Sequence, residues 1–267
     1  MQNIHRINKN KQGELPIQSL NPRTSAIHMW PAKKSLVYDG WILRFLNPYT
    51  YRCNCIYPLK KGKLTTSEKI KKCASMYQQN GYQYLFQIMP HDKKLDILLS
   101  ASGYKKTIQT KWMAKNLDAY TENILIKPKN NCVIRLSNAW LEHRQAIADY
   151  SQQQASIYET FYHAINVQSY PMVLLIDNLP VSCGMGIQVG KYLGIFDIRT
   201  KYGYLRQGHA SLLVRAICKH AKKNGAMHAQ LHVKSDNHAA IHLYHRLEFH
   251  TICDYWFRKK ERGIDPC

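Results

Sequence analysis

The chain has 267 residues and is strongly basic, because 38 lysines and arginines stand against 17 aspartates and glutamates, a formal charge of +21. Hydrophobic residues make up 45% and aromatic residues 11%, a globular composition that excludes a wholly disordered chain. The longest apolar run, Met172–Ile176, is far shorter than the roughly 20 residues that span a bilayer. The polar N-terminus lacks the apolar core of a secretory signal. We therefore expect a cytoplasmic protein without a membrane partner.

The eight cysteines are too few for a disulfide scaffold in a chain of this length. Most lie in apolar or periodic segments, which predicts reduced thiols in the core of a cytosolic protein. Cys53 and Cys55 form a C-x-C pair in a strand-like segment, a weak metal signal because structural zinc sites need a second pair. The positive charge indicates an anionic partner. The charge alone is compatible with nucleic acid, an acidic protein, anionic lipid or a phosphorylated cofactor.

The first half alternates strands and helices after a polar N-terminal arm that we place at residues 1–26. Its helices are marked by apolar residues at helical spacing and by terminal glycines, its strands by β-branched and aromatic runs. The predicted elements are strands at 39–45 and 49–57, a helix at 66–80, a strand at 82–89, a helix at 92–103 and a long strand at 104–115. This half spans residues 27–126.

A polar stretch at 127–131 separates the second half, which we place at residues 131–262. Its strongest helix, at 209–223, has an apolar stripe at i, i+3, i+4, i+7 and i+11 from Ala210. The predicted elements are a strand at 132–137, helices at 139–149 and 154–166, strands at 172–177, 181–189 and 191–198, the helix at 209–223, a strand at 227–233, a helix from Asp236 and a last strand at 249–259.

The two halves end with similar segments. Residues 98–113 align with residues 243–258 at a constant offset of 145, so that Leu98 matches Leu243 and Trp112 matches Phe257. Each segment predicts a short helix, a turn and a long strand. We interpret the likeness as a diverged internal duplication, with chance similarity of one helix and strand as the alternative.

The sharpest chemical signal is the strand, loop and helix at 192–223. A helix starts within Arg206–Ala210, and a helix N-terminus offers unpaired backbone N–H groups at the positive end of the helix dipole. Gly208 and the small Ala210 let a ligand approach the backbone closely. The pattern predicts a pyrophosphate site to which Arg206 adds a cation, and an ordinary strand-to-helix turn is the alternative.

A second segment strengthens this prediction. Residues 237–244 fit the pattern N-x-x-A-x-x-L-Y, from Asn237 to Tyr244. In this order and spacing the two segments resemble the GNAT superfamily of acyl-CoA-dependent N-acyltransferases. The loop signature of that family, R/Q-x-x-G-x-G/A, falls on residues 205–210, where Leu205 departs from it and the last two anchor positions match.

The first half resembles a bacterial GNAT subgroup through a W-P…DGW-L-L-R-F…Y-T-x-R-x-N…P-L block at 30–59, and Phe196–Thr200 matches the subgroup's strand end F-D-[IV]-x-T. The resemblance implies an α+β fold with a mixed, mostly antiparallel sheet flanked by helices, in a tandem of two GNAT-like halves. The first half would complete the fold and roof the acceptor site. Only the second half carries the glycine loop, so it alone is expected to hold a cofactor.

The resemblance also implies acetyl-CoA as cosubstrate and no metal. The pyrophosphate would lie on the helix start, the pantetheine arm would pair with the preceding strand end, and Asn237 would cap its helix or contact that arm. The residues implied in cofactor binding are Ile198, Arg199, Thr200, Arg206, Gln207, Gly208, His209, Ala210 and Asn237.

Tyr244 matches the family's general acid, with a core aromatic as the alternative role. The general base is less determined: Asp197 is the only carboxylate on the strand entering the loop, although a structural partner of a loop N–H or an arginine is favoured. His228 and His232, on one face of a strand, are further candidates.

Two histidines, His238 and His242, have the i, i+4 spacing of metal ligands. The glutamate of an H-E-x-x-H site is replaced by Ala239, so we expect both histidines to face solvent.

The implied function is transfer of an acetyl or other short acyl group from acetyl-CoA to an amine by direct attack in a ternary complex. The sequence leaves the acceptor open, and a basic chain suits an acidic or nucleic-acid-linked one. The alternative is a non-catalytic basic module that binds RNA or acyl-CoA on a GNAT fold. Residues suspected of facing the acceptor, with ordinary strand surface as the alternative, are Trp41, Arg44, Arg52 and Asn54.

Overall fold

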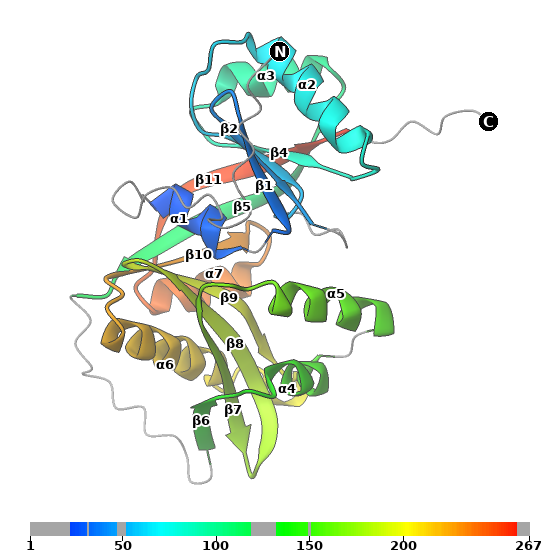
Figure 1. Cartoon of the computed structure of the whole chain (residues 1–267). Helices are drawn as coiled ribbons and strands as arrows, with labels where there is room; N and C mark the ends of the chain where they lie inside the picture. The colour runs from blue at the N-terminus through cyan, green and yellow to red at the C-terminus, as the bar shows by residue number, and fades with distance from the viewer. Residues whose placement is uncertain (1–21, 31, 47–51, 119–131, 149–150, 261–267) are drawn as a thin grey trace.

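A computed structural model describes residues 22–30, 32–46, 52–118, 132–148 and 151–260. The eleven strands formed by these residues lie in one sheet, in the order β1-β2-β3-β4-β11-β5-β10-β9-β8-β7-β6. Figure 1 shows two lobes, one around β1–β4 and one around β6–β9, with β5, β10 and β11 between them. Among the described strands only β3–β4 and β9–β10 pair in parallel. The predicted α+β class with a mixed, mostly antiparallel sheet is therefore confirmed.

The first half carries three helices and five strands among the described residues. They are α1 (Pro22–Met29), β1 (Lys34–Tyr38), β2 (Trp41–Phe45), β3 (Cys55–Pro58), α2 (Thr66–Gln78), β4 (Leu85–Ile88), α3 (Lys93–Ala101) and β5 (Lys105–Asn116). The second half carries β6 (Cys132–Leu136), α4 (Trp140–Ile147), α5 (Gln152–His163), β7 (Gln168–Ile176), β8 (Leu179–Val189), β9 (Tyr192–Thr200), the 3-10 turn η2 (Tyr202–Tyr204), α6 (His209–Lys223), β10 (His228–Lys234), α7 (His238–Arg246) and β11 (His250–Lys259).

The two halves exchange their last strands. α3 begins at Lys93 and α7 at His238, and β5 and β11 begin at Lys105 and His250, so both pairs lie 145 residues apart. β5 pairs with β10 of the second half, whereas β11 pairs with β4 of the first half and with β5. The two similar segments therefore meet at the centre of the sheet, and each half completes its sheet with a strand from the other.

Helix α6 is fixed by its apolar face. Its buried residues Leu213, Val214 and Ile217 belong to the core cluster beneath β7–β9. Gly186 on β8 lies under Ile217, and a Cβ there would stand 2.7 Å from Ile217 Cγ2. The glycine therefore allows α6 to approach β8 closely.

Helix α1 corrects the sequence prediction, because Pro22–Ala26 was assigned to a loosely ordered polar arm. Proline suits the first turn of a helix, where no N–H is needed. Ile27 and Met29 are 4% and 1% exposed, and α1 contacts β8 and β9. Strand β1 was not predicted either, and residues 1–21 of the predicted arm lie outside the described residues.

The seven cysteines of the described residues are free thiols, five of them buried. Burial raises the pKa of the Cys55, Cys73, Cys183 and Cys218 thiols to about 12. They therefore pack as small apolar groups. No helix in the described part of the chain combines the length and apolarity needed to cross a membrane.

Candidate active site

The parallel pair β9–β10 separates in the middle of the second half. Only the first three residues of β9 pair with the first three of β10. Beyond Gly194, β9 pairs with β8 alone among the described strands, and a bulge that shifts this register contains Asp197 at φ +51°. The backbone groups of Ile198–Thr200 on the side toward β10 therefore do not pair with β10, and an extended ligand can form strand-like hydrogen bonds with them.

The N-terminus of α6 follows this strand end. Gly208 is its N-cap at φ +83°, no side chain caps the helix, and a Cβ on Gly208 would meet nothing within 4 Å. Arg206 and Gln207 are exposed, whereas His209 is buried with its Nδ1 3.1 Å from the Tyr204 carbonyl oxygen. The first turn of α6 therefore offers backbone donors and the helix dipole to an anion.

The loop departs from the family signature at Leu205, which is an exposed apolar side chain. Its neighbour Arg206 has φ +61° and an exposed guanidinium. Gln207 donates from Nε2 to the Gly203 carbonyl oxygen at 3.3 Å, which holds the loop against the preceding 3-10 turn. Arg206 is thus the cation of this loop that a phosphate can meet.

Asp197 is tied into an ion-pair network. One carboxylate oxygen accepts from Arg199 Nε at 3.1 Å and the other from Nε of the buried Arg144. Ser182 Oγ donates to the Arg199 carbonyl oxygen at 2.6 Å and lies 2.9 Å from Thr200 Oγ1. These contacts fix the bulge and the strand end, so the geometry favours the structural role for Asp197 over proton transfer.

Asn237 and Tyr244 lie about two turns apart along α7 and have different surroundings. Asn237 Oδ1 accepts from the Ala240 N–H at 3.1 Å and is therefore the N-cap of α7. Tyr244 is 8% exposed in the core cluster next to Phe249, with ring centroids 5.9 Å apart. Burial raises the pKa of Tyr244 to about 12, so the hydroxyl stays protonated at neutral pH.

The two histidines proposed as alternative bases lie in different surroundings on β10. The His228 ring stacks on Tyr192, 5.4 Å away, near the start of the strand. The His232 ring stacks on Trp112 at 5.7 Å and lines a cavity. Burial, with a smaller contribution from Arg52, holds the pKa of His232 well below 6.5, so its imidazole is neutral at pH 7. His232 is thus the base candidate that the structure brings to a cavity.

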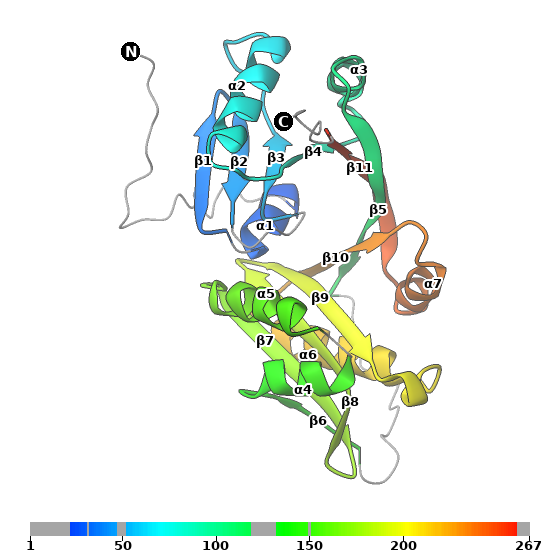
Figure 2. The ribbon, with the colours of Figure 1, turned by 90° about the vertical axis from the view of Figure 1, so that its right-hand side faces the viewer.

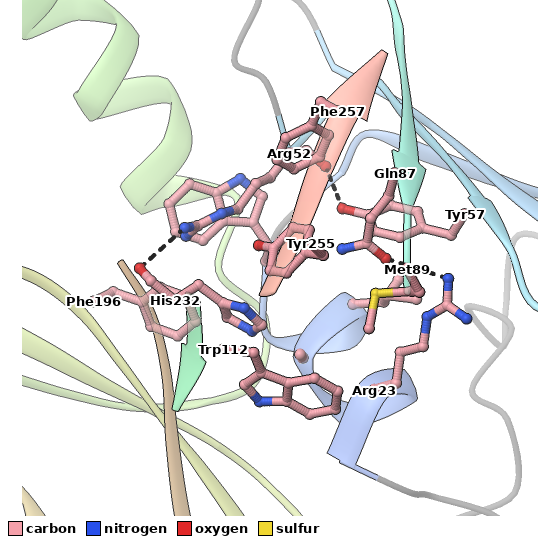
Figure 3. A pocket seen from close by; sticks show the side chains of 13 residues that line it. Arg23, Arg52, Tyr57, Gln87, Met89, Trp112, Phe196, His232, Tyr255 and Phe257 are labelled. Carbon is pink, nitrogen blue, oxygen red and sulfur yellow. Dashed lines mark hydrogen bonds between the residues drawn. The ribbon is translucent and has the colours of Figure 1, made fainter. Parts of the chain in front are cut away.

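The cavity lies where the two halves meet beside α1 (Figure 3). Its volume is about 30 Å³. Its wall is largely aromatic and includes two arginines and one histidine. The lining residues are Arg23, Ala26, Ile27, Trp30, Arg52, Tyr57, Gln87, Met89, Trp112, Phe196, His232, Tyr255 and Phe257. Figure 2 shows α1 between the first-half strands and β9.

Arg52 reaches across the cavity between the halves. Its guanidinium lies over the Trp30 ring at 5.0 Å, and Nη2 donates to the His232 carbonyl oxygen at 3.4 Å. The Tyr57 hydroxyl donates to the Arg52 carbonyl oxygen at 3.1 Å (Figure 3). Arg23 donates from Nη2 to Gln87 Oε1 at 3.4 Å. The cavity therefore has a guanidinium on either side.

The other first-half residues suspected of facing the acceptor lie in the core. Asn54 bridges the backbone of Leu46, accepting from its N–H at 2.9 Å and donating to its carbonyl at 2.8 Å. Trp41 is 4% exposed beneath the Lys69 ammonium at 4.6 Å, and Arg44 is buried and donates to the Trp30 carbonyl oxygen. Of the four, only Arg52 lines the cavity.

Sequence reasoning missed the contribution of α1. Arg23, Ala26 and Ile27 of α1 line the cavity together with Trp30, which directly follows the helix, and their i, i+3, i+4, i+7 spacing is that of one helix face. This spacing was the available signal, but the surrounding polar residues masked it. The predicted histidines His238 and His242 are exposed on α7, and the described residues contain no cluster of three or more metal-ligating side chains.

Residues 137–249 match the Acetyltransferase (GNAT) family. The chain has the GNAT acetyltransferase fold. It is 21% identical over 238 residues to an uncharacterized N-acetyltransferase, YobR, of Bacillus subtilis (strain 168), covering 86% of this chain and 94% of that protein.

Solved structures of similar fold extend over both halves. A GCN5-related N-acetyltransferase from Kribbella flavida has a TM-score of 0.66 at 12% identity, covering 87% of this chain and 91% of its own. A tandem GNAT protein from the clavulanic acid biosynthesis pathway has a TM-score of 0.62 at 12% identity, covering 79% and 76%. At these identities the likeness concerns the fold, including its tandem form.

Proposed function

We propose that the chain is an N-acetyltransferase that moves an acetyl or other short acyl group from acetyl-CoA to an amine within a ternary complex. The observation that carries the proposal is the coincidence of three features at one place. The β9–β10 pair separates, β9 bulges at Asp197, and the uncapped N-terminus of α6 follows with Gly208 in the left-handed conformation.

The residues present fit the cofactor's anionic and extended parts. The open side of Gly208 and the N–H groups from Gln207 to Ala210 suit a pyrophosphate, and Arg206 supplies a counter-charge. The strand end Ile198–Thr200 suits strand-like pairing with a pantetheine arm. Asn237 caps α7, the helix that carries Tyr244. Acetyl-CoA supplies an activated acetyl thioester when bound.

The transfer forms a nitrogen–carbon bond, breaks the carbon–sulfur bond, removes one proton from the amine and delivers one to the thiolate. We assign proton removal to the neutral His232, directly or through water, since this imidazole lines the cavity. We assign proton delivery to Tyr244, whose hydroxyl keeps its proton at neutral pH. A backbone N–H at the bulge stabilises the developing oxyanion. Asp197, held by two arginines, positions this bulge.

Calorimetry and thermal shift with acetyl-CoA test the cofactor site. We expect stabilisation of the wild-type chain by about 2.7 kcal/mol at ~100 times the dissociation constant. Gly208→Asp should abolish it, because the new carboxylate occupies the anion site. Gly225→Asp is the matched control, since Gly225 ends the same helix at φ +86° and also has nothing within 4 Å of a Cβ.

Absence of stabilisation at millimolar acetyl-CoA would contradict the proposal. The alternative would then be a basic module without turnover, and the charge of +21 makes RNA the ligand to examine next. Binding of that kind weakens steeply with salt, with a slope set by the number of neutralised phosphates.

A further inference from the structure

The charge of the cavity beside α1 limits what it can bind. Its lining includes Arg23 and Arg52 but no aspartate or glutamate among the described residues. A site for a polyamine or another polycation needs carboxylates, because like charges repel at short range. Two guanidiniums instead suit a carboxylate or a phosphoryl group, which the planar donor fork can bind in bidentate fashion.

Neither guanidinium is fully compensated within the described residues. Arg52 makes no ion pair there, and its single hydrogen bond to the His232 carbonyl oxygen is 3.4 Å long. The carboxylate nearest to Arg23, that of Asp92, is 4.0 Å away, at the outer limit of an ion pair. Both cations are therefore able to take up a stronger acceptor.

Three buried polar atoms around the cavity lack a hydrogen-bond partner among the residues that the structure describes. They are Arg23 Nε, Trp30 Nε1 and His232 Nδ1. The first two atoms can only donate, so they require an acceptor, and an oxyanion provides several. Buried groups of this kind are normally satisfied, which makes their gathering at one cavity a sign of a ligand site.

The volume of the cavity restricts the size of the enclosed part. About 30 Å³ corresponds to roughly two water molecules. The amine of an acceptor and a small anionic group next to it are of this size. Any larger part of the acceptor must extend out of the cavity toward solvent. The aromatic wall excludes water around the anionic group, which strengthens the attraction of that group to the two guanidiniums.

Resting on the function proposed above, we propose that this cavity is the acceptor site, and that Arg52 and Arg23 select compact amines that carry an anionic group. Arg52 pairs with that group, and the adjacent amine faces His232. The same two cations disfavour the ammonium form, so they promote the neutral amine that attacks.

Acceptor pairs that differ only in the anionic group test this selection. Glycine is compared with methylamine, L-phenylalanine with 2-phenylethylamine, and spermidine serves as the polycation. We expect the carboxylated member of each pair to have at least a tenfold higher kcat/KM, measured by release of the CoA thiol. Aminomethylphosphonate distinguishes a phosphoryl from a carboxylate preference. Equal or better transfer to methylamine, 2-phenylethylamine or spermidine would overturn the inference.

Substitutions assign the selection to the arginines. Arg52→Gln should reduce the preference at least tenfold, Arg52→Lys should retain part of it, and Arg23→Gln provides an independent second site. Arg135→Gln is the control, because it removes the same charge from an exposed position on β6. Thermal melts verify that each variant folds. A preference unchanged in both Arg52→Gln and folded Arg23→Gln would contradict the assignment.

Binding measured apart from turnover separates the two proposals. Calorimetry with glycine and L-phenylalanine is done on protein saturated with CoA. Arg52-dependent binding without acetyl transfer would support the acceptor class and contradict the transferase function. Transfer to simple amines without binding of either amino acid would support the transferase function and contradict the acceptor class. Failure of both amino acids to bind or react would likewise overturn the acceptor class.

Discussion

The two halves begin their equivalent helices in opposite ways. α2 leads from β3 to its parallel neighbour β4, as α6 leads from β9 to β10. At α2, Thr65 Oγ accepts from the Glu68 N–H at 3.3 Å, and Glu68 Oε2 accepts from the Thr65 N–H at 2.8 Å. The bonds from Thr65 lower the pKa of Glu68, which keeps a negative charge at this helix start. At α6, Gly208 leaves the donors uncapped.

The same strand–helix–strand topology thus occurs with a capped helix N-terminus in the first half and an uncapped one in the second. A few residues at the helix start make this difference. The interior of the first half is also occupied by its own side chains. The Tyr77 hydroxyl donates to the Arg44 carbonyl at 2.7 Å and accepts its N–H at 3.1 Å, while the ring stacks on Phe45 at 4.4 Å. This difference supports the proposal that the cofactor binds to the second half, while the first half supplies Arg23 and Arg52 to the cavity.

Among the substitutions that test this difference between the halves, Tyr244→Phe should have the largest effect, a loss of turnover. The change removes only a hydroxyl from a packed ring, so the fold and acetyl-CoA affinity should remain near wild type. Turnover should fall about 10²-fold, because general acid catalysis is lost. Steady-state kinetics beside calorimetry measures both quantities. An unchanged kcat would exclude Tyr244 as the acid and leave it a core aromatic.

Tyr77→Phe, the same change in the first half, should reduce stability and leave turnover unchanged. Loss of the hydroxyl leaves the buried Arg44 N–H without its partner, which should reduce the free energy of unfolding by about 1–3 kcal/mol. Acetyl-CoA affinity and kcat should not change. Urea denaturation followed by circular dichroism, together with kinetics, measures these effects. A loss of turnover in the still-folded variant would show that the Tyr77 hydroxyl itself is needed for turnover and would contradict its purely structural role.

The pH profile examines His232. Burial lowers its pKa well below 6.5, so kcat should be flat near neutrality and decline only at more acidic pH, where the imidazole gains a proton. Because Arg52 also lowers this pKa, Arg52→Gln should move the acidic decline to higher pH. His232→Gln should reduce kcat about tenfold and remove the decline. A profile that His232→Gln leaves unaltered would point to another base.

Thr65→Ala has the smallest expected effect. Removing the N-cap hydroxyl should reduce stability by about 1 kcal/mol. It should not create a second acetyl-CoA site, since Glu68 remains at the helix start. The binding stoichiometry from calorimetry should stay at one per chain. A second binding event would break the assignment of a single cofactor site to the second half.

Local patterns predicted most elements of both halves. α6 has the predicted bounds, 209–223, because its apolar stripe and flanking glycines are encoded within a few turns. The α3–β5 and α7–β11 segments were also predicted, together with their offset. α1 was missed because its eight residues bury only a few apolar side chains against distant strands.

The candidate site was predicted only where it is local in sequence. The 205–210 loop follows a contiguous signature, and its geometry is that of an open helix start. The cavity instead joins Arg23, Arg52 and His232, which are brought together by the packing of α1 and the exchange of β5 and β11. No short sequence pattern predicts that such distant residues lie together. The same holds for the ion pair between Asp197 and Arg144, which are far apart in the sequence.

The strand exchange also affects how the chain acquires its structure during synthesis. β4 has β11 as its antiparallel neighbour, and β11 ends at Lys259, so the first half emerges from the ribosome long before its sheet is complete. Pairing over such a sequence separation closes slowly. The early half therefore carries an unpaired strand edge until β11 has been synthesised, and a chain shortened before His250 would leave both halves incomplete.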